Sequence, residues 1–281
     1  MSADALATGG RATRAGRGRR TGKRAFSGQR LLGLAGILGF LATWELIPRL
    51  GLIDAKYLPP ASEVVMALVR DLGLTAFWVS VGETMKAWFL GLVLAIVLAV
   101  VLGFVIGSST FLRRATNSTV EFLRPIPSVA LIPLAVLLFG VKLESSLMLI
   151  TYAAFWQVLI QVLYGVADVD MVANNTAKTY GLGPLARIRY VVFPTALPYL
   201  MTGVRLAATV ALVLAITAEL VIGSPGLGRE IALAQSGGAI SGMYALVLAT
   251  GLIGVVINAL MRLIEKKTLS WHSSVRSEVI V

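Results

Sequence analysis

Few side chains in this 281-residue chain could carry out catalytic chemistry. The chain has no cysteine and one histidine, His272, close to the end of the sequence. Metal sites built from histidine and cysteine are therefore excluded. Ser224, in the turn-like segment Gly223-Ser224-Pro225-Gly226, lacks the histidine that a serine nucleophile needs. We therefore predict no catalytic residue and no metal site, and we expect that this chain is not an enzyme.

The sequence also lacks the motif of a phosphate-binding loop. A phosphate-binding loop requires Gly-x4-Gly-Lys followed by Ser or Thr. The Gly22-Lys23 pair is followed by Arg24 and lacks the upstream glycine. We expect no cofactor in this chain, so any work against a gradient must draw its energy from a partner or from an ion.

Several polar residues lie within or beside apolar stretches. Glu45 and Glu219 lie near the ends of such stretches, whereas ion-coupled carriers usually place carboxylates near the middle. Arg205 lies about one and a half turns from the opposite end, close enough to reach the headgroups. Gln157 and Gln161 share one helix face and could bind a substrate or a neighbouring helix. The candidate path or gate residues are Pro127, Gln157, Gln161, Arg205, Glu219 and Gly226.

The connection over residues 165–198 has the pattern of a helix, a sharp bend and a second helix. Asp168 or Asp170 can cap a short helix over 171–180, and its negative charge is favourable there. Gly181 and the residues that follow it, Leu182-Gly183-Pro184, should end that helix sharply.

A second helix is predicted over residues 185–193. It should stop near Pro194, and Pro198 should open the next apolar stretch. A plain connector lying on the membrane surface would not need two helices and a bend. We therefore interpret 165–198 as a segment that a partner can grip.

The composition places these segments in a membrane. Apolar residues make up 57% of the chain and charged residues 14%, against about 45–50% and about 25% in soluble domains. We predict an all-α polytopic membrane protein with six transmembrane helices. The third is short and carries three prolines, so we expect it to be kinked or partly unwound. The six stretches are 31–48, 85–107, 126–141, 146–164, 199–222 and 243–264.

The distribution of positive charge predicts the orientation. With both termini on one side, that side receives 18 of the 25 Lys and Arg residues, and the opposite side receives 6. Because positive charge collects on the cytoplasmic side, we predict a multi-pass protein of a prokaryotic plasma membrane with both termini in the cytoplasm. The net charge of +11 then serves orientation, and no nucleic-acid partner is expected.

Three segments follow from this topology. Residues 1–30 form a basic, disordered cytoplasmic tail, 31–268 a transmembrane domain, and 269–281 a second cytoplasmic tail. Ser62 is expected to cap a short amphipathic helix over 63–72 on the outer face. Four outward basic residues suit either an anion or an acidic face of a partner protein: Lys56, Arg70, Lys142 and Arg229.

Ordered motifs give the chain a specific resemblance. Asn175-Thr176-Ala177, Gly181 and Pro194 resemble the Glu-Ala-Ala-x3-Gly…Leu-Pro loop of type I ABC importer permeases. Other motifs resemble the branch that imports nitrate, taurine, aliphatic sulfonates and thiamine-pyrimidine precursors. They are Val120-Glu121-Phe122-Leu123-Arg124-Pro125-Ile126-Pro127, Ala130-Leu131-Ile132-Pro133, Gly203-Val204-Arg205-Leu206-Ala207, Ala218-Glu219 and Gly223-Ser224-Pro225-Gly226-Leu227-Gly228. The resemblance spans roughly residues 31–271.

The resemblance implies the type I importer permease fold and a set of partners. A homodimer of this chain would form the path, two separate ATPase subunits would hold ATP and Mg²⁺, and an external binding protein would deliver a small solute such as a sulfonate, taurine or nitrate. The third to fifth stretches would line the path between the two copies. The implied coupling residues are Asn175, Thr176, Ala177, Gly181, Arg187 and Pro194.

One departure from the family pattern affects that coupling. The leading glutamate of the family loop is Asn175 here. Either the ATPase tolerates a neutral residue at this position or the coupling is weaker. Arg187 and Arg189 either meet acidic groups of the partner or serve only to orient the chain.

The main alternative is a secondary carrier or channel that needs no ATPase. It predicts ionisable residues at mid-membrane or half-helix repeats, and neither is evident in the sequence. An integral membrane enzyme and a structural subunit are further alternatives. Only an importer should bind an ATPase that carries the phosphate-binding loop this chain lacks.

Overall fold

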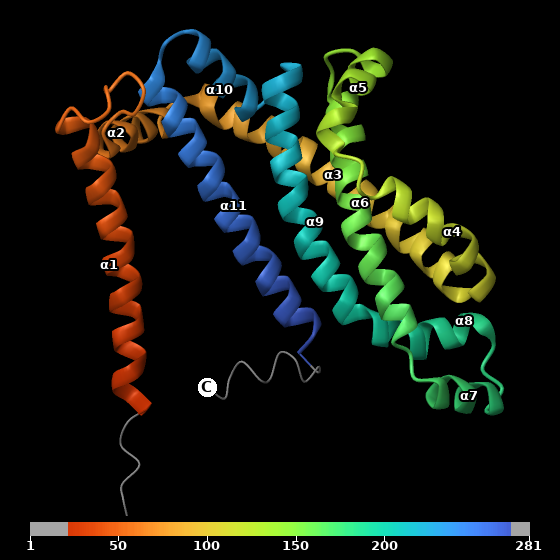
Figure 1. Ribbon diagram of the computed structural model, residues 1–281. Coiled ribbons are helices and arrows are strands. Elements are labelled where there is room, and N and C mark those ends of the chain that lie inside the picture. Colours follow the sequence, from red (N-terminus) through yellow and green to blue (C-terminus); the bar gives the residue numbers. More distant parts are fainter. Residues whose placement is uncertain (1–21, 271–281) are drawn as a thin grey trace, which may run out of the picture.

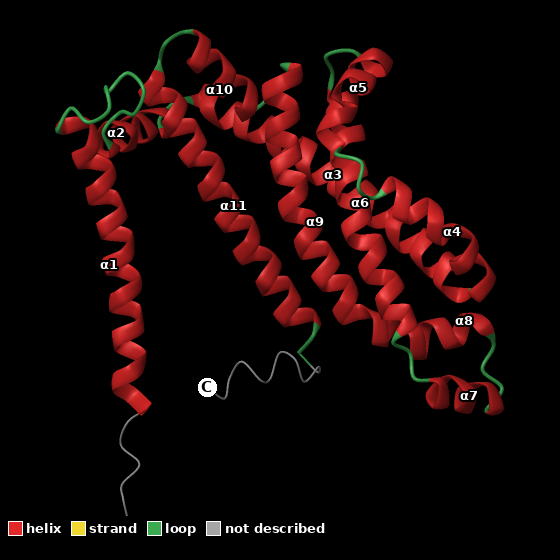
Figure 2. Ribbon diagram, in the orientation of Figure 1, coloured by secondary structure: helices red, strands yellow, loops and turns green. Residues whose placement is uncertain are grey.

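The computed structural model describes residues 22–270, and side chains from Leu32 onward except that of Leu34. Every regular element in this range is helical (Figures 1 and 2). The all-α prediction is therefore confirmed. Most of the predicted N-terminal tail and the C-terminal tail from residue 271 lie outside the described residues.

The helices follow one another with short connections. The first half contains α1 (Gly22–Arg49), α2 (Ala61–Leu72), α3 (Thr75–Ser108), α4 (Thr110–Leu123), the 3₁₀ turn η1 (Ser128–Leu131) and α5 (Ile132–Phe139). The second half contains α6 (Leu143–Ala167), α7 (Met171–Thr179), α8 (Pro184–Arg187), the π-helical turn η2 (Ile188–Val192), α9 (Phe193–Ile222), α10 (Leu227–Ser236) and α11 (Ile240–Thr268). The first helix therefore begins before the boundary predicted at residue 30.

Four helices in the described range are long and apolar enough to cross a membrane. They are α3, α6, the continuous helix Pro184–Ile222 that contains α9, and α11. A fifth candidate is a pair, α4 with η1 and α5, that is bent by 81°. Pro127 stands at the start of η1, where the helix is interrupted. The bend confirms that the third predicted stretch is broken, and α1 contains the first, so the structure is consistent with six spans.

Small residues hold the central helices together. Ala87, Gly91, Ala95, Ala99, Gly103 and Gly107 recur every four residues along α3 and are buried. A Cβ added at Gly91 would lie 2.5 Å from Ile150 Cγ2, and one at Gly103 would lie 2.6 Å from Val162 Cγ1. Both neighbours belong to α6, so this stripe lets the two backbones approach closely.

The predicted helix end near Pro194 is wrong. Pro184–Ile222 is one continuous helix of 39 residues that runs through Pro194 and Pro198. Pro194 lies in the first turn of α9, directly after the π turn, where a missing N–H is least costly. The Thr195 hydroxyl donates a hydrogen bond to the Val191 carbonyl at 2.8 Å, so that carbonyl is not left free.

The predicted cap of α2 is also wrong. Pro60 occupies the capping position, and Ser62 lies inside the helix. The Ser62 backbone N–H and hydroxyl donate instead to the Glu45 carboxylate, at 2.9 Å and 2.8 Å. Glu45 therefore joins α1 to the start of α2.

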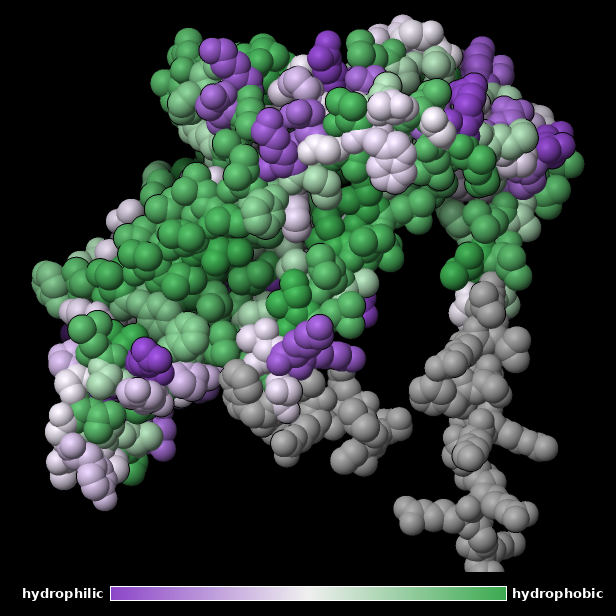
Figure 3. Space-filling view, turned by 180° about the vertical axis from the view of Figure 1, so that it is seen from behind, coloured by the Kyte–Doolittle hydropathy of each residue, from purple (hydrophilic) through white to green (hydrophobic). Residues whose placement is uncertain are grey.

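The short helices lie at the two ends of the long ones (Figure 1). We call the end with α2, α5 and α10 the α10 end, and the end with α7 and α8 the α7 end. The surface between them is predominantly hydrophobic, and hydrophilic residues gather toward both ends (Figure 3). This banded surface is typical of a protein that spans a bilayer.

Candidate functional site

At the α7 end, a short helix and a tight turn make a rigid projection. The Asp170 carboxylate accepts a hydrogen bond from the Val172 N–H at 2.8 Å and so caps α7. At the other end of α7, Gly181 has a φ of +77°. The Gly181 N–H donates to the Lys178 carbonyl and the Leu182 N–H to the Ala177 carbonyl, which is the Schellman pattern. Asp170 is thus the cap that the structure selects, and Gly181 makes the predicted bend.

This projection exposes several large apolar side chains among polar ones. Tyr180 and Leu185 are 81% and 83% exposed, and Met171 and Val172, at the start of α7, are 79% and 71% exposed. Asn175 is exposed, whereas Ala177 is buried. The segment therefore presents a surface of mixed apolar and polar side chains, and its shape is set by its own hydrogen bonds.

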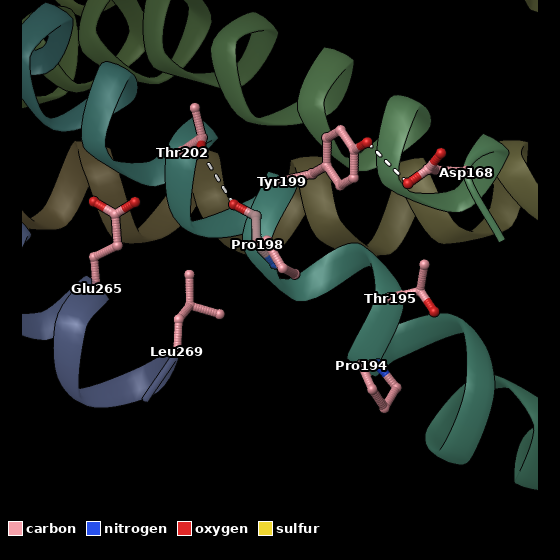
Figure 4. A pocket seen from close by; sticks show the side chains of 8 residues that line it. All are labelled: Asp168, Pro194, Thr195, Pro198, Tyr199, Thr202, Glu265 and Leu269. Carbon is pink, nitrogen blue, oxygen red and sulfur yellow. Dashed lines mark hydrogen bonds between the residues drawn. The ribbon is translucent and has the colours of Figure 1, made fainter. Parts of the chain in front are cut away.

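Two contacts connect the projection to the long helices. Arg187 Nη1 donates to Asn174 Oδ1 at 3.3 Å and ties α8 to α7. The Tyr199 hydroxyl donates to Asp168 Oδ2 at 2.9 Å and ties α9 to the end of α6. Pro194 and Tyr199 line a pocket of about 600 Å³ between α9 and α11 (Figure 4). A push on α8 is therefore transmitted directly into α9, because the two form one continuous helix.

At the α10 end, Glu219 lies at the centre of a buried polar cluster. Its side chain is 1% exposed, and Oε2 accepts hydrogen bonds from Thr84 Oγ1 and the Gly228 N–H, both at 2.9 Å. Thr84 Oγ1 in turn accepts from the Leu227 N–H at 2.9 Å. Glu219 Oε1 has no hydrogen-bond partner within the described part of the chain. The cluster joins α3, α9 and the first turn of α10.

Two glycines are required for this cluster to close. Gly226 has a φ of +150°, and a Cβ there would lie 2.1 Å from Glu219 Cδ. A Cβ at Gly228 would lie 2.2 Å from the Ile216 carbonyl oxygen. Ser224, in the same turn, shares a hydrogen bond with Ser146 at 3.0 Å. Glu219 and Gly226, two of the candidate path or gate residues, are therefore in direct contact, in a close-packed junction between helices.

The remaining predicted path residues are separated from one another. Arg205 Nη1 donates to Glu265 Oε2 at 3.1 Å, which links α9 to α11. Gln157 and Gln161 lie where α6 crosses α9, since a Cβ added at Gly203 would lie 3.0 Å from Gln161 Cβ. Pro127 lies in the bend between α4 and α5. The structure therefore supports helix packing for the two glutamines and an ion pair for Arg205.

A polar cavity beside α4 escaped the sequence analysis. Its volume is about 570 Å³, and it lies between α4 and the second half of α6. None of the six predicted path residues lines it. The recurrence of polar residues every three or four positions along α4 is the signal that could have found it. Its polar side chains are Arg113, Thr116, Asn117, Glu121 and Arg124.

Comparison with known proteins places this geometry in a family. Residues 65–270 match the family model described as binding-protein-dependent transport system inner membrane component. The taurine transport system permease protein TauC of Escherichia coli is 27% identical over 255 residues, which cover 89% of this chain and 93% of that protein. The nitrate import permease protein NrtB of Leptolyngbya laminosa is 27% identical over 199 residues, covering 71% and 70%.

A solved structure shares the fold. An amino acid ABC transporter chain, solved with histidines, superposes with a TM-score of 0.57 at 19% identity, covering 68% of this chain and 94% of that one. At this identity the match shows the fold alone.

Proposed function

Because the chain belongs to the binding-protein-dependent transport system inner membrane components, the permeases of type I ABC importers, we propose that it forms the membrane path of an importer for a small oxyanion. Two copies form the path, a separate ATPase drives it, and an external binding protein delivers the solute. The family and the fold support the transport role. The substrate class is supported by relatives named for taurine and nitrate, both of which carry an anionic oxygen group.

The exposed apolar side chains of α7, the turn after it and α8 are the observation that carries this proposal. A projection with Tyr180 and Leu185 largely exposed offers a partner a surface to bury. In the proposal, α7 and α8 seat on the ATPase subunit, and ATP-driven closure of two ATPase subunits moves two such projections together. Because Pro184–Ile222 is one helix, that motion turns α9 as a rigid body. ATP and Mg²⁺ bind to the ATPase and not to this chain.

Asn175 lies on the exposed surface of α7. In the proposal it faces the ATPase at the position where the family pattern has glutamate, and the apolar side chains around it supply most of the contact. Thr176 is exposed beside it. The α7 end is then cytoplasmic in a prokaryotic plasma membrane, and the binding protein docks at the α10 end.

A mild-detergent pull-down of the tagged chain from its native membranes tests the proposal. The expected result is a near-stoichiometric ATPase with an intact phosphate-binding loop. A Leu185→Glu variant should lose the ATPase, because a charge would be buried at the contact. The matched control is Leu233→Glu, which changes an exposed leucine on α10, at the opposite end, and should retain the ATPase.

Two outcomes would overturn the proposal. A homo-oligomer that is stable alone, under conditions that keep known ABC importers intact, would favour the carrier or channel alternative. Retention of the ATPase by Leu185→Glu at the wild-type level would show that the ATPase docks elsewhere on the chain.

A further inference from the structure

Arg124 lies much deeper between the long helices than its sequence position suggests. The Tyr152 hydroxyl donates to the carbonyl of the preceding residue, Leu123, at 2.6 Å. Tyr152 is about 14 Å from the Leu143 end of α6 and about 22 Å from its Ala167 end, at 1.5 Å per residue. Arg124 also shares a cavity with Ile160 of α6. In Figure 1 the link between α4 and α5 accordingly lies beside the middle of α6. The orientation argument counts Arg124 among the 18 basic residues of the cytoplasmic side, whereas in the structure it lies beside the middle of α6.

A charge at this depth needs a polar environment. Arginine in contact with hydrocarbon is costly, so charged residues within spans face cavities or paths rather than lipid. Arg124 is exposed on this chain. Its side chain makes no hydrogen bond or ion pair with any other residue that the structure describes, so the guanidinium keeps its donors available. It lies in the bend of a broken span, the type of segment that lines cavities in transporters.

The cavity beside Arg124 has the chemistry of an anion site. Arg113 lies on the same face of α4, three turns earlier. Arg113 Nη2 donates to the Gly107 carbonyl at 3.0 Å, while its buried Nε has no partner among the described residues. Glu121 is the acidic residue of the lining, and its Oε1 accepts from Asn117 Nδ2 at 2.9 Å. Two guanidinium groups against one carboxylate leave the cavity with net positive charge.

From this placement we propose that Arg124 and Arg113 form an oxyanion-binding site partway along the transport path. A planar guanidinium pairs with two oxygens of a sulfonate or nitrate group, so the site holds the solute by its anionic end. Arg124 is the main ligand, because its side chain has no competing partner, and Arg113 adds positive charge to the same cavity from three turns earlier on α4. This inference rests on the proposed function. It places the selection of anions at the arginines of α4 and of the bend that follows it.

Uptake by the complete transporter tests the site. The chain is reconstituted into proteoliposomes with its ATPase and binding protein, and ATP-driven uptake of taurine and of nitrate is measured. Arg124→Gln should lower uptake of the transported anion at least about tenfold, which corresponds to the loss of one charge-assisted contact. Arg124→Lys should keep more uptake, since it keeps the charge. The matched control is Arg114→Gln, an exposed arginine that does not line the cavity.

Basal ATP hydrolysis separates failure of the site from failure of the proposed function. If Arg124→Gln hydrolyses ATP in the absence of solute as the wild type does but transports poorly, the site is supported. If uptake by Arg124→Gln equals uptake by Arg114→Gln, the proposed anion site is wrong, whereas the proposed importer function is unaffected. If the wild-type chain binds no ATPase and transports neither anion, the proposed function fails as well.

A labelling experiment tests the location of the site directly. The chain has no cysteine, so Asn117→Cys introduces a single reactive thiol in the cavity lining. A negatively charged methanethiosulfonate reagent should modify this thiol faster than a positively charged one, and the transported anion should slow the reaction. Equal rates for the two reagents, with no protection by the anion, would overturn the proposal.

Discussion

The two ends of α9 make their polar contacts in opposite environments. At the α10 end, Glu219 is 1% exposed and receives two hydrogen bonds from other elements. Toward the α7 end, in the half of α9 that begins at Phe193, Arg205 forms an ion pair with Glu265, and their side chains are 39% and 20% exposed. The adjoining α7 and α8 carry exposed apolar side chains. One end is closed within the chain, and the other leaves its surface available to a partner.

This difference separates stability from coupling. A buried polar group that loses its partner costs far more than an exposed one, because water cannot replace the lost hydrogen bond. Changes at the α10 end should therefore destabilise the fold. Changes at the α7 end should leave the fold intact and impair the response to the partner.

The largest effect is expected for Glu219→Ala. The change leaves the Thr84 hydroxyl and the Gly228 N–H without their acceptor and opens a cavity, so the free energy of unfolding should fall by about 3 kcal/mol. Unfolding in mixed detergent micelles measures it. The control is Glu230→Ala in the first turn of α10, where a carboxylate contributes at most about 1 kcal/mol.

A double-mutant cycle that combines Glu219→Ala with Thr84→Val tests this prediction more closely. If Glu219 and Thr84 act as one cluster, the double variant should lose less stability than the sum of the two single losses. Strict additivity, or a Glu219→Ala variant as stable as the wild type, would show that the buried cluster does not hold α10 in place.

A large effect on uptake, with little effect on stability, is expected for Gly181→Pro. Proline holds φ near −65°, whereas Gly181 has φ +77° and donates its N–H to Lys178. We expect insertion and detergent stability to be retained, because the turn is exposed. For the variant to adopt the wild-type bend should cost about 2 kcal/mol or more. The fraction of molecules with the correct bend, and with it ATP-driven uptake, should therefore fall at least about tenfold.

Gly183→Ala is the matched control for this turn. Gly183 has a φ of −65°, and no atom lies within 4 Å of an added Cβ, so alanine should be tolerated. Uptake assays on equal amounts of inserted protein measure both variants. If Gly181→Pro takes up the solute at the wild-type rate, the bend at Gly181 is not part of the coupling mechanism.

The smallest effect is expected for the ion pair at the α7 end. Arg205→Gln and Glu265→Gln in a double-mutant cycle should show a coupling energy of about 0.5 kcal/mol, because solvent screens this partly exposed pair. The cycle is measured by unfolding in the same micelles. A coupling energy as large as that of the Glu219 and Thr84 pair would show that polar contacts at the two ends stabilise the fold equally.

Local sequence signals predicted the segments whose structure is set locally. The Asp170 cap and the Gly181 bend depend on residues within one or two turns, and both are found in the structure. The broken third stretch followed from its prolines. The end predicted near Pro194 was wrong, because a π turn and the first-turn position of Pro194 let the helix continue.

The polar cavity could not be located in the same way. The α4 helix is too polar for a hydropathy reading to place it within a span, so its arginines were assigned to a surface loop. Only the fold shows that the C-terminal end of α4 reaches α6, where the Tyr152 hydroxyl donates to the Leu123 carbonyl. The partners of Glu219 and Arg205 also lie far away in the sequence, Thr84 by 135 residues and Glu265 by 60.

The sequence by itself determined that the chain is an all-helical membrane protein, because hydropathy and residue type are properties of the chain alone. It also determined the bend at Gly181, since a positive φ is a local requirement that glycine meets. The tertiary structure decided which polar residues are buried, paired or exposed to a cavity. Those outcomes depend on the packing of distant helices, so Glu219 became part of a closed contact while Arg124 faces open space in the middle of the helices.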